Sequence, residues 1–279
     1  MLGTGTPNAE PDRAGASLAI IVNNMPYLVD FGPGVIRQAM AAQQRGVAAL
    51  LPQNLTIAFL THLHSDHTLG YPDLIFTPWT LERAQPLRVF GPPGTQAMTN
   101  HLLQAWQSDI QERLSGLEPA NASGYRVKVT EIEAGTIYQD ALLRVNAFPA
   151  RHGSWPAFGY RFITPNGVIV ISGDTAPSPN IVEHYAGCNI LVHEVYSHIK
   201  LQERPFKWRR YHASVHTSTR ELAEIARQVQ PDLLVLTHQL FWGQSAAELV
   251  AEIRANYNGK VVSARDLDVF QLNAVQNEK

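Results

Sequence analysis

The chain has 279 residues, of which 24 are acidic and 22 basic, and its formal net charge is −2. Apolar residues make up 45% of it, enough for a full core, and we expect a single domain over residues 1–279. The slightly acidic balance argues against a protein that coats nucleic acid, because such proteins are usually basic. The single cysteine, Cys188, excludes a fold held together by disulfides.

The start of the chain bears on its location. No apolar run reaches the length of a membrane span, and no signal peptide is visible, so we expect a cytoplasmic protein without membrane association. The first residues, Met1-Leu2-Gly3-Thr4-Gly5, read like the end of a strand whose beginning is missing. Because this N-terminus looks truncated, a periplasmic or secreted location stays open.

The first predicted elements form a hairpin. Residues 16–22 and 26–31 are apolar runs joined by Asn23-Asn24, a pattern typical of two paired strands and a tight turn. Asp30 ends the second run. It is either a turn residue or a carboxylate that supports a metal-binding histidine, since such histidines usually need a partner.

The densest polar motif follows residues 55–60, an apolar run that predicts a buried strand. It reads Thr61-His62-Leu63-His64-Ser65-Asp66-His67. Imidazole and carboxylate are the ligands that borderline divalent metals prefer. Nothing about folding requires four such groups directly after a core strand, so the motif predicts a metal-binding loop.

One helix is expected before this loop, over residues 35–45, and two after it, over residues 67–76 and 95–114. The last of these begins after Gly91-Pro92-Pro93-Gly94. A glycine loop at a helix start can bind an anion, but a purely structural role is favoured here.

Three later strand-like runs repeat the theme of a ligand at a strand end. Residues 142–148, 168–171 and 233–237 are followed by His152, Asp174 and His238. The same placement after four strands predicts convergence on one point. Seven ligands give each of two metals three or four contacts if one carboxylate bridges, and leave room for a water.

The region between Asp174 and His238 adds two candidates and a basic stretch. Glu194 ends an apolar run, and His216 precedes a predicted helix that starts with capping-box spacing at Ser218 and Glu221. We expect a solvated loop at Phe206-Lys207-Trp208-Arg209-Arg210-Tyr211, with contact to a phosphate or sulfate as the alternative.

Together these motifs resemble the metallo-β-lactamase superfamily over nearly the whole chain, and within it the hydrolases of RNase Z and arylsulfatase type. The resemblance is carried by Leu2-Gly3-Thr4-Gly5, Asp30-Phe31-Gly32, His62-x-His64-x-Asp66-His67, His152, Ser172-Gly173-Asp174-Thr175, His193-Glu194, His216 and His238. It implies an α/β fold, the αββα sandwich of two mixed sheets with helices on the outer faces.

The resemblance also implies roles for single residues. His62, His64 and His152 would hold one zinc ion, Asp66, His67 and His238 the other, and Asp174 would bridge them. Catalytic roles are implied for Asp66, for His216 as proton donor and for Glu194 as its support. The expected cofactor is two Zn²⁺ per chain, with Mn²⁺ or Fe²⁺ as alternatives.

We expect a dinuclear-zinc hydrolase of small anionic esters, phosphodiesters or aryl sulfates, in which a metal-bridging hydroxide attacks the ester. The alternatives are an RNase Z-type tRNA 3′-endonuclease without the usual arm and a lactonase. A di-iron oxidoreductase is disfavoured, because His64 stands where such proteins carry a glutamate.

The expected partner is a small ester rather than nucleic acid. RNase Z enzymes of the common type insert a tRNA-binding arm, whereas residues 153–173 read as two paired strands with no room for one. A homodimer is left open.

Overall fold

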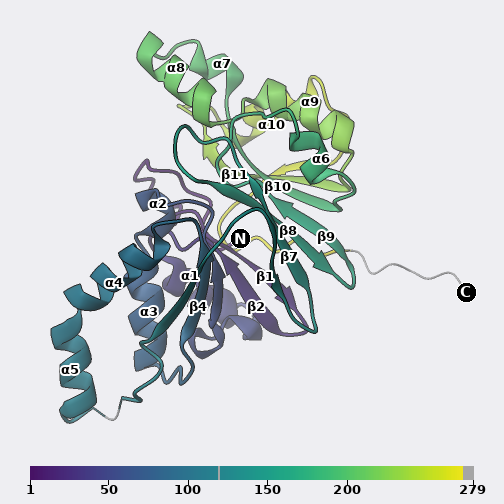
Figure 1. Ribbon diagram of the computed structural model, residues 1–279. Helices are drawn as coiled ribbons and strands as arrows, with labels where there is room; N and C mark the ends of the chain where they lie inside the picture. Colours follow the sequence, from purple (N-terminus) through teal and green to yellow (C-terminus); the bar gives the residue numbers. More distant parts are fainter. Residues whose placement is uncertain (119, 273–279) are drawn as a thin grey trace, which may run out of the picture. The chain divides into compact units, whose positions relative to one another are not determined.

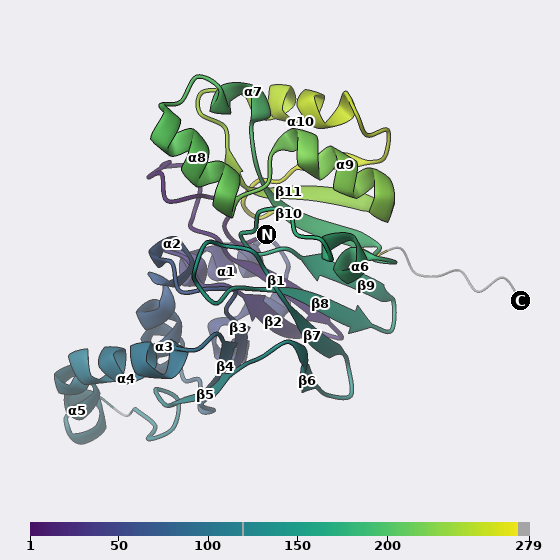
Figure 2. The same ribbon diagram turned by 45° about the horizontal axis from the view of Figure 1, so that its top comes forward.

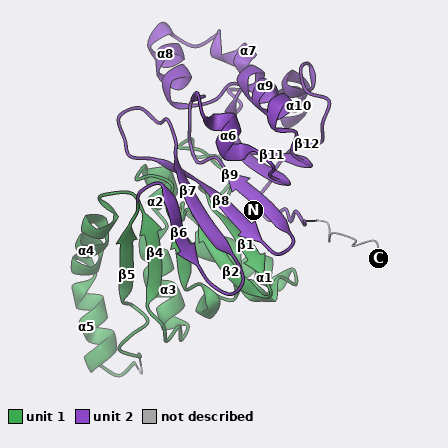
Figure 3. Ribbon diagram, turned by 45° about the vertical axis from the view of Figure 1, so that its right-hand side comes forward, with its two compact units in different colours: residues 1–132 green, residues 133–279 purple. Residues whose placement is uncertain are grey.

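The computed structural model describes residues 1–118 and 120–272, which fall into two compact units, Met1–Ile132 and Glu133–Lys279 (Figure 3). Each unit contains one mixed sheet and its own helices, which confirms the α/β class with two mixed sheets. The expectation of one domain stays a prediction. Within residues 1–118 and 120–272, no helix combines the length and hydropathy needed to cross a bilayer.

The first unit contains a five-stranded sheet in the order β1-β2-β3-β4-β5. Its strands are β1 (Leu18–Val22), β2 (Met25–Val29), β3 (Ile57–Phe59), β4 (Leu87–Gly91) and β5 (Val127–Glu131). β1 and β2 pair antiparallel and the later neighbours pair parallel. Asn23 and Asn24 have φ values of 46° and 64°, the left-handed conformation that a tight hairpin turn requires, so the predicted hairpin is confirmed.

The helices of this unit are α1 (Val35–Gln44), η1 (Ala48–Leu50), η2 (Pro52–Asn54), α2 (Ser65–Thr68), α3 (Tyr71–Thr80), α4 (Thr95–Ala105) and α5 (Gln107–Ser115). α1 packs against α3 beside the strands (Figure 1). Their buried faces repeat at the helical period, as in Val35, Ile36 and Ala39 of α1.

The helix expected over residues 35–45 is confirmed as α1, whereas the two helices expected later in this unit are each divided in the structure. The helix expected over residues 67–76 stops after Thr68, and α3 starts at Tyr71. Between them the Gly70 N–H donates to the Phe31 carbonyl, and a Cβ on Gly70 would lie 2.3 Å from the Gly32 carbonyl oxygen. The break therefore comes from a tertiary backbone contact.

The helix expected over residues 95–114 is interrupted at Trp106, between α4 and α5. The Trp106 ring contacts Phe76 of α3, with centroids 5.6 Å apart. The change of direction at Trp106 thus accompanies a long-range aromatic contact that helical periodicity does not reveal.

The second unit contains a seven-stranded sheet in the order β12-β11-β10-β9-β8-β7-β6. Its strands are β6 (Gly135–Gln139), β7 (Arg144–Pro149), β8 (Phe158–Thr164), β9 (Gly167–Ile171), β10 (Ile190–Tyr196), β11 (Leu233–Leu240) and β12 (Val261–Ser263). Strands β9 to β12 pair parallel and β6 to β9 antiparallel. The antiparallel pair β8 and β9 confirms the two paired strands predicted within residues 153–173.

The helices of this unit are α6 (Ile181–Tyr185), α7 (His198–Leu201), α8 (Phe206–Val215), α9 (Thr219–Val229) and α10 (Ala246–Arg254). One buried apolar cluster joins the sheet to α6, α9 and α10. Figure 2 shows α7 and α8 on the same side of β10 and β11 as α9 and α10. The predicted capping box is confirmed, since Ser218 and Glu221 bond reciprocally at the start of α9.

One expectation in this region is wrong. The stretch 206–211, expected as a solvated loop, begins helix α8. Pro205 directly before the helix is a normal start signal, and the aromatic residues have neighbours along the helix.

A fully buried arginine connects separate segments of the first unit. The Arg83 guanidinium donates to the carbonyls of Leu55, Leu74, Ile75 and Gly124 over 2.8 to 3.0 Å. Burial lowers the pKa of Arg83 to about 10, so the side chain stays protonated at neutral pH. One side chain thereby satisfies four buried acceptors that come from different parts of the sequence.

We expect Arg83→Met to lower the free energy of unfolding by about 2 to 4 kcal/mol, because it leaves several buried carbonyls without donors. Urea denaturation followed by circular dichroism measures the change. The matched control is Arg37→Met, since Arg37 is exposed and makes one ion pair of 3.4 Å with Asp73. That control should change stability by less than about 0.5 kcal/mol. Equal loss in both variants would contradict the role given to Arg83.

Candidate functional site

The first ligand group lies in the first unit, directly after β3. It comprises His62, His64, Asp66 and His67, the last two in the short helix α2. His62, Asp66 and His67 are buried, and His64 is partly exposed. The predicted loop therefore places three ionisable side chains in the interior at the end of a core strand.

Asp30 organises this group. Its carboxylate accepts hydrogen bonds from the Thr61 amide at 2.8 Å and from the Thr61 hydroxyl at 2.9 Å, and it lies 2.8 Å from His67 Nδ1. Asp30 has a φ of 57°, a conformation that aspartate tolerates better than most residues. Of the two roles left open for Asp30, the structure favours support of a predicted ligand, since a carboxylate at one ring nitrogen fixes the tautomer of the other.

The ring nitrogens of the first group approach one another. His62 Nε2 and His64 Nδ1 are 3.0 Å apart, and His67 Nε2 lies 3.4 Å from an Asp66 carboxylate oxygen. Sequence reasoning missed Thr61, whose hydroxyl contacts both Asp30 and, at 3.0 Å, His62 Nδ1. The only sequence feature that could have indicated a role for Thr61 is its position immediately before His62.

A glycine makes this close packing feasible. A Cβ on Gly32 would lie 2.4 Å from the Asp66 carbonyl oxygen and 2.5 Å from the Gly15 carbonyl carbon. The neighbouring Phe31 N–H donates to the His67 carbonyl at 3.0 Å. The Asp30-Phe31-Gly32 motif thus packs its backbone against α2. A residue larger than glycine at position 32 would prevent these contacts.

The second ligand group lies in the second unit and comprises His152, Asp174, Glu194, His216 and His238. All five are buried, with exposed fractions of at most 5%. His152, Asp174 and His216 each offer a ligand atom within 4.8 Å of the others, and so do Glu194, His216 and His238. The strand-end residues predicted from this half of the chain are therefore brought together.

Main-chain contacts and main-chain conformation set the orientation of His152 and His238. His152 Nδ1 lies 2.9 Å from the Val215 carbonyl, a contact that fixes the orientation of the ring. His238 lies within β11 yet has a φ of 42°, next to the register shift between β10 and β11 at Glu194 and Val195. His238 Nε2 is 3.5 Å from an Asp174 carboxylate oxygen.

His216 is the C-cap residue of α8 and stands beside two carboxylates. Its Nδ1 is 3.4 Å from Glu194 and 3.9 Å from Asp174. The Glu194 carboxylate also accepts from the Thr217 amide at 2.8 Å. Burial, and then the charge of Asp174, raise the pKa of Glu194 well above its ordinary value, although His238 and the Thr217 and Thr175 amides act against them. Burial thus favours the neutral form of the Glu194 carboxyl, which faces His216 Nδ1.

His193, adjacent to Glu194, has a different environment. Its ring lies 3.1 Å from the Tyr185 hydroxyl and 2.6 Å from the Glu194 carbonyl. Burial lowers the pKa of His193 to about 4, so the ring is neutral at physiological pH. These contacts give His193 a packing role rather than a catalytic one.

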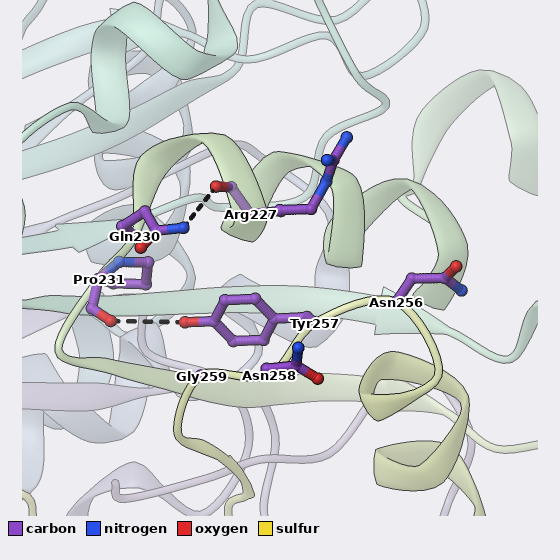
Figure 4. Close-up of a pocket in the computed structure, with 7 residues that line it drawn as sticks. All are labelled: Arg227, Gln230, Pro231, Asn256, Tyr257, Asn258 and Gly259. Carbon is purple, nitrogen blue, oxygen red and sulfur yellow. Dashed lines mark hydrogen bonds between the residues drawn. The ribbon is translucent and has the colours of Figure 1, made fainter.

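Two further features fit structural roles. The glycine loop before α4 has its helix N-terminus occupied by the Glu131 carboxylate, which accepts from the amides of Gly94 at 2.8 Å and Gln96 at 3.0 Å. This agrees with the structural role favoured from the sequence. A cavity of about 330 Å³ at the end of α9 is drawn in Figure 4. Its seven lining residues all lie outside the predicted ligand set: Arg227, Gln230, Pro231, Asn256, Tyr257, Asn258 and Gly259.

The donor atoms fit divalent metal ions. Each group combines imidazole nitrogen with carboxylate oxygen, the ligand set of zinc and of similar borderline metals. The Asp30–His67 contact adds the carboxylate partner that metal-binding histidines usually have. Burial of several such groups together is costly unless protons or cations compensate their charge.

Comparison with known proteins gives consistent results. A family model described as a β-lactamase superfamily domain matches residues 26–239. The ribonuclease Z of Mycobacterium marinum is 34% identical over 281 residues, which cover 98% of this chain and 98% of that protein.

Two solved structures share the fold. The metallo-β-lactamase fold protein YhfI from Bacillus subtilis has a TM-score of 0.73 at 15% identity, covering 95% of this chain and 94% of that one. A diphosphatase of the PhnP family has a TM-score of 0.65 at 18% identity, covering 98% and 97%.

We expect Asp30→Asn to weaken metal binding about 10- to 100-fold, because the amide cannot hold the His67 tautomer as the carboxylate does. Asparagine tolerates the left-handed backbone, so the fold should be kept. Zinc affinity is measured by competition with a chromogenic chelator. Asp73→Asn, a partly buried carboxylate of α3, is the control and should bind zinc like the unmodified protein. Unchanged affinity in Asp30→Asn would show that the contact does not serve metal binding.

Proposed function

Since this chain belongs to the metallo-β-lactamase superfamily, in its ribonuclease Z-like branch, and is a metal-dependent hydrolase acting on ester bonds, we propose that it cleaves small anionic esters. Phosphodiesters are the first substrate class and aryl sulfates the second. The observation that carries the proposal is the buried contact of His216 with Glu194, which provides a proton donor among the predicted ligands.

The two ligand groups are proposed to bind two zinc ions per chain, with Mn²⁺ or Fe²⁺ as alternatives. One ion would be held by His62, His64 and His152, the other by Asp66, His67 and His238, with Asp174 between them. When bound, such ions lower the pKa of water and stabilise negative charge on the ester oxygens. Asp66, which was also predicted to be catalytic, would act in catalysis through its role as a metal ligand.

His216 and Glu194 would carry out the proton transfer to the leaving group. Glu194 lies 3.4 Å from Nδ1 of His216 and would orient the ring, so that Nε2 could donate a proton to the leaving oxygen. The Thr217 and Thr175 amides hold the Glu194 carboxyl in place. Glu194 is thus proposed to position His216, not to contact the substrate. The same buried imidazole could alternatively serve as a ligand, because its nitrogen lies as close to Asp174 and His152 as a ligand would.

A second candidate function is tRNA 3′-end cleavage. The observation that favours it is the 34% identity to a ribonuclease Z over 98% of both chains. Against it stand the β8–β9 hairpin in the place of an arm and the net charge of −2. Extensive contact with tRNA phosphates requires many basic side chains. We therefore keep the small ester as the leading substrate class.

We expect His216→Ala to lower kcat on bis-p-nitrophenyl phosphate about 10²- to 10⁴-fold, the usual contribution of a general acid. Elemental analysis should find two ions per chain before and after the change, because the proposed ligand set does not include His216. The control is His101→Ala, an exposed histidine of α4, which should keep both metal content and rate.

Loss of one ion together with activity would make His216 a metal ligand. An unchanged rate would remove its proposed part in proton transfer. One ion or none in zinc-supplemented, unmodified protein would overturn the dinuclear proposal.

The substrate class is tested by comparing kcat/KM on bis-p-nitrophenyl phosphate, an aryl sulfate and a precursor tRNA with one metal-loaded preparation. We expect turnover of a small ester and weak cleavage of the precursor at physiological salt, since few basic side chains are available to hold tRNA. Efficient cleavage specific to the tRNA 3′ end would favour the second candidate function instead.

A further inference from the structure

The segment between β10 and α9 forms a helical pair, α7 and α8, that ends at His216. The His216 N–H donates to the His212 carbonyl, which continues the helical bonding up to this residue. Trp208, His212 and His216 follow one another at intervals of four, so their side chains lie on one face of the helix.

The rings on this face are nearly parallel. The centroids of His238 and His216 are 5.6 Å apart with an interplanar angle of 26°. His216 and His212 follow at 5.7 Å and 28°, and His212 and Trp208 at 5.9 Å and 27°. A row of stacked rings thus runs from a predicted metal ligand, past the predicted proton donor, to a tryptophan at the surface.

The outer end of the row is open to solvent. Trp208 is 42% exposed and Tyr211 is 41% exposed. The Tyr211 ring stands edge-on to Trp208, with centroids 5.9 Å apart, and the Trp242 ring lies 4.8 Å from His212. Large aromatic rings left exposed beside a buried site are typical of ligand contact surfaces, because burying them on a ligand is favourable.

The charge of the segment matches an anionic ligand. The segment contains one acidic residue, Glu203, which pairs with Lys200 at 2.7 Å, and four further basic residues, Arg204, Lys207, Arg209 and Arg210. The Lys207 ammonium lies 5.8 Å from the Trp208 ring centroid, so a cation accompanies the exposed ring. A ligand with both a planar ring and a negative charge would meet stacking and charge complementarity together.

The segment is firmly anchored. The Glu252 carboxylate of α10 accepts from the Ser197 hydroxyl at 2.7 Å, from the His198 amide at 2.9 Å and from the Thr219 hydroxyl. These bonds hold both ends of the α7–α8 segment. Leu201 of α7 also packs in a buried cluster with Trp242 against it. A rigid support of this kind suits a surface that orients a ligand.

We propose that the face of α8 formed by Trp208, Tyr211 and His212, named here the α8 ring face, binds a planar aromatic group of the substrate. The substrate would then be an anionic ester that carries a nucleobase or an aryl ring. This inference rests on the proposed function for the location of the reacting ester. The ring face itself determines specificity and takes no part in proton transfer.

The test measures binding rather than turnover. Isothermal titration calorimetry on the zinc-loaded protein compares two ligands with a ring, thymidine 5′-monophosphate and phenyl phosphate, with two that lack one, deoxyribose 5-phosphate and methyl phosphate. Trp208→Ala should weaken binding of a ring-bearing ligand about tenfold, as loss of base stacking does, and leave the ringless ligands unchanged. Trp208→Phe should restore most of the loss.

The control variant is Phe206→Ala, on the same helix but on another face, with the side chain 70% exposed. It should bind all four ligands like the unmodified protein. Loss confined to thymidine 5′-monophosphate would identify a nucleobase as the bound group, and loss confined to phenyl phosphate would identify an aryl ring. Equal loss for ringed and ringless ligands, or no loss, would overturn the proposal.

Analytical ultracentrifugation of the same variants tests whether a second copy of the chain, rather than a substrate ring, covers the α8 ring face. If Trp208→Ala dissociates a homodimer and leaves the four binding constants unchanged, the α8 ring face is an interface between copies and the proposal is wrong. Because these measurements need no hydrolysis, they can succeed even if phosphodiester turnover is absent. They can also fail while turnover is present, so the two proposals are separable.

Discussion

The burial of carboxylates in this protein constrains much of its architecture. Asp30, Asp174 and Glu194 are at most 5% exposed, and an unpaired charge in such a place costs several kcal/mol. Each unit therefore surrounds its carboxylates with donors. Asp30 is bonded by Thr61 and lies beside His67, while Glu194 accepts from main-chain amides of two loops. These bonds fix the loops after the strands, so the cost of burying charge is offset by contacts that also position the predicted ligands.

Much of this could be predicted from the sequence, because the signals are local. His152, Asp174 and His238 each follow a run of apolar residues, and that alternation of core strand and polar end is readable in one dimension. The Asn23-Asn24 turn and the Ser218–Glu221 capping box depend on neighbours a few residues away, and both are confirmed. The family resemblance rested on the same local motifs, and comparison with known proteins confirms it.

What could not be predicted depends on contacts between distant residues. The orientation of the His152 ring is fixed by the Val215 carbonyl, and a backbone carbonyl has no sequence signature. The helix expected over residues 95–114 is interrupted where Trp106 meets Phe76, a contact across thirty positions of sequence. Likewise residues 206–211 were expected to form a solvated loop, because basic stretches usually lie in solvent. The stacking of Trp208 and His212 toward His216 is a three-dimensional arrangement that the sequence does not reveal.

The left-handed backbone at His238 has a consequence for how such a centre can change during evolution. Outside glycine, this conformation is populated mainly by asparagine, aspartate and histidine, and most other side chains are destabilised in it by roughly 1 to 2 kcal/mol. Of the residues that bind metals, those with nitrogen or oxygen donors are thus accepted here more readily than cysteine. The main-chain conformation at position 238 therefore disfavours substitution of this histidine by cysteine. It thereby also disfavours a change in the metal preference of the site toward softer metals.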